Sequence, residues 1–318
     1  GVLMNTVVSF FKNNSDIDSL RDSGYGDADF EVMKTPLYYY DNSSVGQQRV
    51  ANKDMYFRAD TGQQLAIHGD RYKLVPHQAM IDTARNVLER SQLNLKDIKE
   101  TIQVGDDGGV CFVRHQLPNH QIETPDGDTA IMELLHINSH TSVWPYQATA
   151  GANQNACTNH QVFLGEIAAI YKARHTQALD VDKGASQMNR IMDVMDQQNN
   201  IWAEWKNTDV ALLQAVQHIA EATGSKVALD LLKEKEYFNT IIETPAVYNN
   251  SSFMYTLEKY MGHYSKKMGK NYWAVYNALT DWATHHTGTR RNTVDLPTSQ
   301  VKRSEKIQQT IRNFSIAA

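Results

Sequence analysis

The stretch Asn271-Tyr-Trp-Ala-Val-Tyr-Asn277-Ala-Leu-Thr280-Asp-Trp-Ala-Thr-His285-His286 is the most informative part of this chain. Its spacing predicts a helix with two different faces. An apolar and aromatic face carries Trp273, Tyr276 and Thr280. A polar face presents Asn277, Asp281 and the histidine pair. We therefore expect an amphipathic helix within a helical C-terminal half.

The patterns around this stretch divide the chain into a strand-rich first half and a helical second half. Apolar residues recur at helix-face spacing over residues 188–205, and further helices are expected over residues 210–222, 226–237, 252–262 and 299–314. In the first half, one helix is expected over residues 79–88. Short alternating runs predict strands over residues 55–58, 64–68, 72–75, 109–114, 130–138 and 142–150. Turns over residues 105–109 and 125–127 suit antiparallel pairs.

These elements predict an α+β fold with three regions. Residues 1–50 form an arm or loop region, because residues 13–50 are rich in Asn, Ser, Asp and Gly and lack sustained periodicity. Residues 51–178 form a strand-rich core of antiparallel strands packed on helices. Residues 179–318 form a helical, basic region, which the pattern also allows to be continuous with the core.

The composition is that of a soluble globular protein. The 318 residues are 41% hydrophobic and can bury a sizeable core. The two cysteines, Cys111 and Cys157, form no disulfide framework and favour a reducing compartment. No apolar run approaches the roughly 20 residues that a membrane span needs, and residues 2–11 lack the form of a signal peptide. We expect a cytoplasmic protein without membrane contact.

The charge is distributed unevenly along the chain. Residues 259–318 hold ten Lys or Arg and three acidic residues, a balance of +7. The whole chain carries −5, so residues 1–258 carry −12. This division favours a polyanion-binding face on an otherwise acidic body. The alternative is that the basic end packs against that body or forms a solvated helix.

Cations and aromatic rings occur together in the basic region. Cations that follow phosphates, with rings on which bases stack, are what single-strand binding requires. The predicted nucleic-acid-binding residues are Lys266, Lys267, Lys270, Tyr272, Arg290, Arg291, Lys302, Arg303, Arg174 and His175, with Tyr264 as a second stacking ring. Trp273 and Trp282 fall about 180° apart on an ideal helix, so at least one should be buried.

A polar cluster over residues 136–176 leaves two chemical alternatives open. Cys157 and His160 could join His136 or His140 around zinc. Against this, His136 and His140 are spaced roughly 13 Å apart along a strand. Cys157 with a histidine base could act as a nucleophile, although a buried small residue is the commoner explanation. We predict no catalytic residue, no metal and no cofactor.

Four blocks, over residues 65–76, 138–142, 157–159 with 174–176, and 277–285, resemble a known family. This is a phage- and plasmid-borne family named only as a domain of unknown function (number 932). The resemblance implies a mobile-element gene near replication or recombination genes, and it supplies no catalytic residues. It marks six family-motif positions of unknown role, which are His140, Cys157, Asn159, Asn277, Thr280 and His285.

The hypothesis that joins these features is a phage-encoded protein that binds single-stranded DNA and promotes annealing in recombination or replication. We expect it to act as a homo-oligomer in the cytoplasm of an infected bacterium. By fold-level analogy, a strand-rich half followed by a basic helical half is similar to phage single-strand annealing proteins. One alternative is an interaction protein that binds a host protein through its acidic body. Another is an enzyme built on Cys157, His140 and His175.

Overall fold

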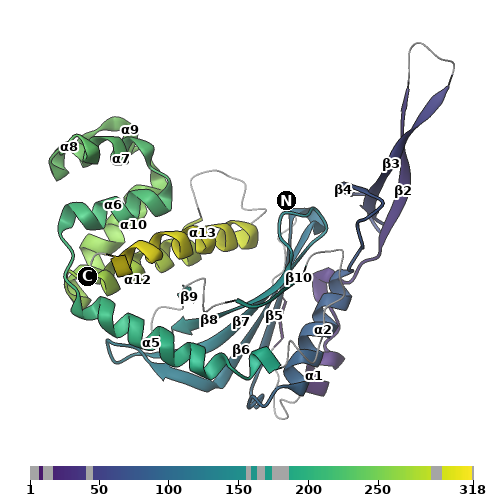
Figure 1. Cartoon of the computed structure of the whole chain (residues 1–318), viewed down its shortest axis with the longest axis horizontal. Coiled ribbons are helices and arrows are strands. Elements are labelled where there is room, and N and C mark those ends of the chain that lie inside the picture. Colours follow the sequence, from purple (N-terminus) through teal and green to yellow (C-terminus); the bar gives the residue numbers. More distant parts are fainter. Residues whose placement is uncertain are drawn as a thin grey trace. The chain divides into compact units, whose positions relative to one another are not determined.

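The computed structural model describes residues 7–9, 17–40, 46–154, 159–162, 169–173, 186–287 and 296–316 (Figure 1). The fold is α+β, as predicted, with two antiparallel sheets mainly in the first half and helices in the second. The chain forms two compact units. Unit 1 comprises residues 1–117, 134–149 and 169–190, and unit 2 comprises residues 118–133, 150–168 and 191–318. The sequence patterns predict divisions at residues 50 and 178, whereas three long strands contribute residues to both units.

The larger sheet has seven strands in the order β1-β5-β6-β7-β8-β10, with β9 also paired to β8. The strands are β1 (Val7–Ser9), β5 (Lys99–Gly105), β6 (Val110–Glu123), β7 (Thr129–Ser139), β8 (Tyr146–Gln154), β9 (His160–Val162) and β10 (Ala169–Ala173). The predicted turn over residues 105–109 joins β5 to β6, and Gly108 has the positive φ (108°) that this turn requires. The predicted turn over residues 125–127 joins β6 to β7.

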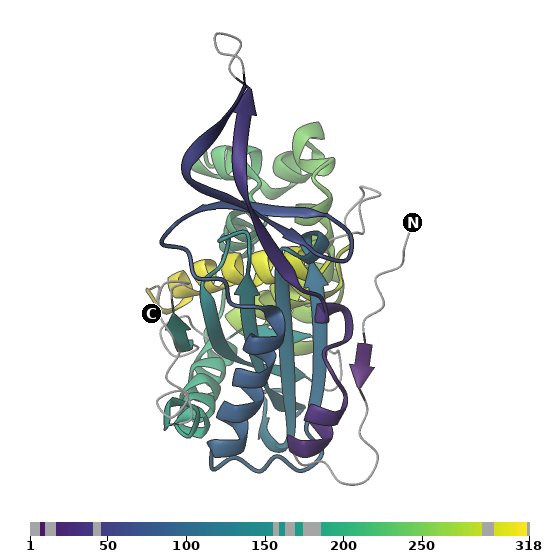
Figure 2. The same ribbon diagram turned by 90° about the vertical axis from the view of Figure 1, so that its right-hand side faces the viewer.

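The smaller sheet belongs to unit 1 and consists of β2 (Val32–Tyr40), β3 (Gln47–Arg58) and β4 (Gln64–Gly69). β4 pairs with β3 only over residues 53–57, so the outer end of the β2–β3 hairpin is two-stranded (Figures 1 and 2). The arm or loop predicted for residues 13–50 is therefore wrong for the described residues. They form α1 (Ile17–Asp22), the 3-10 turn η1 (Gly26–Ala28) and β2.

One predicted strand is absent, because residues 72–75 have no ladder partner among the described residues. The segment instead runs irregularly from β4 into α2 (His77–Arg90). The Tyr72 ring stacks on His68 with centroids 3.7 Å apart, and the carbonyl of Val75 accepts from the side chain of Asn138 at 2.8 Å. These side-chain contacts replace the backbone pairing that the alternation predicts.

The helices of unit 2 follow the predicted order. They are α5 (Ile191–Asn207), α6 (Leu212–Thr223), α7 (Lys226–Lys233), α8 (Phe238–Glu243), α9 (Pro245–Tyr248), α10 (Ser251–Lys259), the π-helical turn η3 (Tyr260–Tyr264), α11 (Ser265–Met268), α12 (Tyr272–His285), α13 (Leu296–Ile311) and the 3-10 turn η5 (Arg312–Ile316). α7 is shorter than the predicted helix over residues 226–237. Among the described residues, none of the helices combines the length and apolarity needed to cross a bilayer.

The centre of unit 2 is α12, which contacts α5, α6, α10 and α13 (Figure 1). The side chain of Asn271 caps it by accepting from the amide of Ala274 at 3.0 Å. Every residue from 272 to 284 is buried. The predicted two-faced helix is therefore wrong, because a helix enclosed by others has no solvent face and its polar residues must bond internally.

Candidate nucleic-acid interface

Three exposed lysines precede α12 and form what we call the lysine cluster, Lys266, Lys267 and Lys270. The first two lie on α11, and Lys270 follows Gly269, whose φ of 94° reverses the chain. Within the part of the chain that is described, no carboxylate lies within ion-pair distance of these three ammonium groups. Lys233, by contrast, pairs with Asp230 at 3.1 Å. All three side chains are therefore accessible from solvent.

The prediction that Tyr272 and Tyr264 stack on bases is wrong. Tyr272 is 1% exposed and Tyr264 is 2% exposed, so a base cannot reach either ring. The Tyr272 hydroxyl accepts from Gln214 at 2.7 Å, and its ring lies 4.8 Å from that of Phe314. Tyr272 is the first residue of the enclosed helix α12, and Tyr264 lies in η3, which contacts that helix. Trp273 and Trp282 are also both buried.

The two predicted residues of α13 differ in role. Lys302 is exposed. Arg303 is half-buried, and its Nη1 donates to the carbonyls of Trp282, at 3.3 Å, and His286. Its guanidinium also lies 5.4 Å from the centroid of the Trp282 ring. A cation at the carbonyl end of a helix is a favourable cap, so the structure assigns Arg303 to capping α12 in place of the predicted phosphate contact.

Several predictions lie outside the described residues. They concern Arg174, His175, Arg290, Arg291 and Cys157. The zinc and nucleophile alternatives both include Cys157, so their central residue is among these. Over the ranges that the structure describes, no group of three or more His, Cys, Asp or Glu side chains could hold a metal ion.

Two family-motif positions, Asn159 and His285, meet in unit 2. The Nε2 of His285 lies 3.0 Å from the Oδ1 of Asn159, and the Nδ2 of Asn159 donates to the Tyr264 hydroxyl at 3.1 Å. That hydroxyl donates to Asp281 at 2.8 Å, and Tyr255 donates to the same carboxylate at 2.6 Å. This chain of hydrogen bonds fastens β9 to α12. Its members satisfy one another, so its geometry supports a structural junction.

The other described motif positions are also structural. The side chain of Asn277 donates to the carbonyl of Trp273 at 2.9 Å, and Thr280 donates to the carbonyl of Asn277 at 3.1 Å. Both bonds stay within α12. His140 belongs to unit 1, where its ring stacks on His77 with centroids 3.9 Å apart. The two bonds within α12 account for the Asn277 Nδ2 and the Thr280 hydroxyl in a buried setting.

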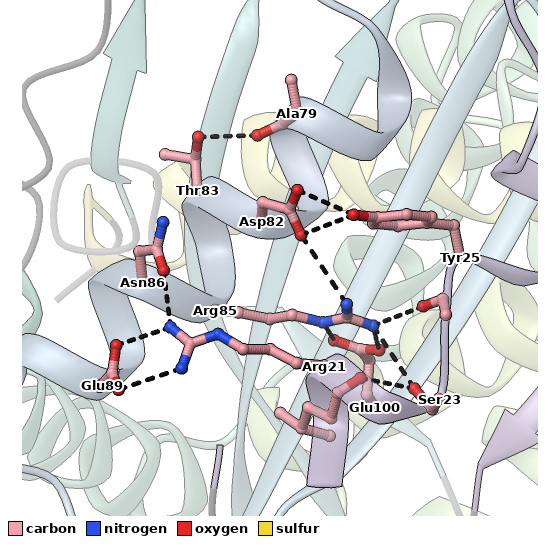
Figure 3. Close-up of polar contacts among 12 residues, drawn as sticks. Arg21, Ser23, Tyr25, Ala79, Asp82, Thr83, Arg85, Asn86, Glu89 and Glu100 are labelled. Carbon is pink, nitrogen blue, oxygen red and sulfur yellow. Dashed lines mark hydrogen bonds and ion pairs between the residues drawn. The ribbon is translucent and has the colours of Figure 1, made fainter. Parts of the chain in front are cut away.

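A buried ionic network lies in unit 1 between α2 and β5 (Figure 3). Arg85 of α2 binds Glu100 of β5 through two hydrogen bonds of 2.7 and 3.0 Å, and both side chains are 1% exposed. His115 donates to the same carboxylate at 2.9 Å. Burial opposes ionisation, yet the bonds from His115 and Arg85 hold the pKa of the Glu100 carboxyl below its ordinary value.

The same network holds the segment that the sequence predicts as an arm. Arg85 also donates to the carbonyl of Gly24 at 2.7 Å, and Tyr25 donates to Asp82 at 2.9 Å (Figure 3). Nearer the surface, Arg21 of α1 pairs with Glu89 of α2 at 2.6 Å. These bonds attach α1 and η1 to α2. The Arg85 and Glu100 side chains at its centre are buried and bonded to each other and to neighbouring elements, so we interpret the network as structural.

The buried histidine beside this network predicts acid sensitivity. Burial and the neighbouring His115 hold the pKa of His136 well below its ordinary 6.5. The unfolded chain then binds more protons as the pH falls below that value, so the free energy of unfolding should decrease by up to about 1.4 kcal/mol per pH unit for this group. Urea unfolding at about pH 7.5, 6.5 and 5.5 measures the slope.

The variant His136→Gln should flatten that slope because it removes the titrating group. The matched control is His263→Gln, at an exposed position, which should leave the slope unchanged. An unaltered slope in His136→Gln would contradict the assignment.

Three exposed tyrosines of unit 1 are not among the predicted site residues. Tyr38, Tyr39 and Tyr40 end β2 and are 52%, 52% and 76% exposed. Their signal is visible as three consecutive tyrosines in the sequence. The residues around them show no alternation of polar and apolar side chains, so the sequence predicts a loop here and not a strand that exposes tyrosines.

Comparison with known proteins yields one match. The sequence model of a family described as "Domain of unknown function (DUF932)" matches residues 64–308, more than half of the chain. Neither a curated protein nor a solved structure matches the chain.

Proposed function

We propose that this chain, which belongs to the DUF932 family, binds nucleic acid and prefers single strands. The observation that carries the proposal is the lysine cluster, Lys266, Lys267 and Lys270, exposed and without a carboxylate partner among the described residues. An ammonium group that faces water without a counter-charge is free to bind a phosphate oxygen. Three such groups within five residues form a compact polyanion contact.

The physical consequence of this contact is a strong dependence on salt. Each phosphate that a lysine neutralises releases condensed counterions, so the logarithm of the binding constant falls by about 0.7 per contact for each tenfold rise in salt. Three contacts with single-stranded DNA therefore give a slope of about −2. Fluorescence anisotropy with a labelled oligothymidylate and its duplex counterpart, over a salt series, measures this slope and the strand preference.

The variant Lys266→Glu/Lys267→Glu/Lys270→Glu should lose most of the binding and about 2 units of the salt slope. It should still fold, because the three side chains are exposed. The matched control is Lys226→Glu/Lys233→Glu/Lys235→Glu, which makes the same charge change at exposed lysines of the same unit. Equal loss in both variants would show that total charge, and not this cluster, drives binding. Retained binding in the first variant would reject the cluster.

The proposal extends to the setting expected from the family resemblance. We place the protein in the cytoplasm of a phage-infected bacterium, where it promotes annealing of single strands in recombination or replication as a homo-oligomer. The described free cysteine, Cys111, is buried, which suits a reducing compartment. Capture of a host protein together with no DNA binding at low salt would favour the interaction-protein alternative instead.

A further inference from the structure

We propose that the outer end of the β2–β3 hairpin is a platform on which the bases of single-stranded DNA stack. The proposal rests on the proposed function and gives it a second element. We call this end the tyrosine ribbon and define it as residues 38–40 of β2 and residues 47–49 of β3. The ribbon lies before residue 64 and so outside the region that the family model matches.

The ribbon exposes three consecutive aromatic rings. Tyr38, Tyr39 and Tyr40 keep 52%, 52% and 76% of their surface in water, whereas Tyr56 near the base of the hairpin is 4% exposed. β4 does not reach this part of β3, so the outer end of the hairpin has no third strand in the described sheet (Figure 2). Aromatic surface left together in water marks a binding site.

The strand register arranges these rings for stacking. Tyr38 lies opposite Arg49 and Tyr40 opposite Gln47, so these four side chains share one face of the ribbon. Residues two apart on one strand are about 6.8 Å apart. Stacked bases in a nucleic-acid strand are about 3.4 Å apart. A single base therefore fits between the rings of Tyr38 and Tyr40, with a ring against each of its faces.

The charge around the ribbon suits a polyanion. Over residues 32–54 the hairpin sequence carries three cations, Lys34, Arg49 and Lys53, and two acids, Asp41 and Asp54, a balance of +1. Lys34 and Arg49 share the single Asp54 carboxylate, at 3.5 and 3.6 Å. One carboxylate cannot neutralise two cations, so positive charge remains beside the rings.

The side chains across from the tyrosines favour nucleic acid over a protein partner. They are Gln47, Gln48 and Arg49, and none of the six ribbon residues is aliphatic. Protein interfaces also favour Tyr and Arg, but their buried centre is more apolar than this ribbon, which has no aliphatic side chain. Rings flanked by amides and a guanidinium are the composition of surfaces that stack bases and hold phosphates.

The test compares Tyr38→Ala/Tyr39→Ala/Tyr40→Ala with the wild-type chain by anisotropy of a labelled oligothymidylate. Losing the stacking rings should weaken single-strand binding at least about tenfold. It should leave the salt slope unchanged, because no charge is removed. Duplex binding should change less than about twofold, because paired bases are not available to the rings.

Two matched variants isolate the stacking. Tyr38→Phe/Tyr39→Phe/Tyr40→Phe keeps the rings and should keep the affinity. Tyr237→Ala/Tyr248→Ala removes exposed tyrosines of unit 2, at 82% and 66% exposure, and should also keep it. All variants change exposed side chains, so we expect each of them to fold. An unchanged Tm would confirm this.

The outcomes separate the two proposals. If the wild-type chain binds no DNA at low salt, the proposed function fails, and the ribbon proposal fails with it. If the wild-type chain binds and the triple alanine variant binds equally well, only the ribbon proposal is overturned. The same holds if the alanine variant loses single-strand and duplex binding alike. Loss confined to single strands, with the phenylalanine variant intact, supports the ribbon.

Discussion

Replacing Glu100 with Gln should lower the free energy of unfolding by about 3–5 kcal/mol. The guanidinium of Arg85, 1% exposed, would remain buried without the carboxylate that it now binds through two hydrogen bonds. The bond from His115 to the same carboxylate would also be weakened. A charge left unpaired inside a protein costs far more than the pair contributes, because it has lost its hydration without compensation. Urea unfolding at neutral pH measures the change.

The matched control is Glu89→Gln, on the same helix as Arg85, which removes the carboxylate that pairs with Arg21 of α1. This pair is solvent-exposed, so its loss should cost less than about 1 kcal/mol. The double variant Arg85→Met/Glu100→Leu should be more stable than Glu100→Gln, because it removes both charges together. A similar small loss from Glu89→Gln and Glu100→Gln would mean that the buried pair is not desolvated as described.

Replacing Trp273 with Ala should destabilise the chain by about 3–5 kcal/mol. The ring is fully buried and packs against Trp202 and Tyr276, with centroids 5.3 and 5.4 Å away. None of the described acceptors bonds its Nε1, so the loss reflects packing and the cavity that remains. Thermal unfolding followed by near-ultraviolet circular dichroism measures it.

An exposed aromatic of the same unit provides the comparison for this substitution. Tyr237→Ala, at 82% exposure, should change the free energy of unfolding by less than about 0.5 kcal/mol. Trp273→Phe should fall between the two, because it keeps part of the buried volume. A loss below 1 kcal/mol for Trp273→Ala, on the scale of surface changes, would contradict a packed aromatic core around α12.

Helices could be predicted from the sequence because the apolar residues that define a helix face lie only three or four positions apart. The patterns over residues 188–205 and 271–286 correspond to α5 and α12, since each carries its packing residues at helical spacing. The exposure of residues along α12 was not predictable. Asn277, Thr280 and Asp281 are polar and so predict a solvent face, but each is buried and makes hydrogen bonds within α12 or with Tyr255 and Tyr264.

Five strands, β1, β2, β5, β9 and β10, lie outside the predicted strand ranges, and β5 and β2 show two different reasons. β5 alternates regularly, but one of its buried positions is Glu100, which an alternation rule counts as polar. Its partner Arg85 is distant in sequence, so the pairing is invisible in a linear pattern. The outer half of β2 is exposed on both faces and has no alternation to detect. Alternation of polar and apolar residues arises where one face of a strand is buried. It therefore cannot predict a strand that is stabilised by backbone pairing alone.

In the candidate site, the exposure of the lysines could be predicted from the sequence, but the exposure of the tyrosine rings could not. The exposure of Lys266, Lys267 and Lys270 follows from the cost of burying unpaired cations. A tyrosine has no such constraint, because its ring is equally suited to a core and to a surface. Tyr272 is buried and Tyr40 is exposed, and the difference depends on tertiary neighbours that composition does not reveal.

The interleaving of the two units has a consequence for the order in which the chain is built on the ribosome. Unit 1 includes residues 169–190, and unit 2 draws on residues 118–133. Unit 1 therefore cannot be completed until residue 190 has emerged, by which time the first segment of unit 2 is already outside the tunnel without most of its partners. Unit 1 can hence complete its fold only after part of unit 2 has been synthesised.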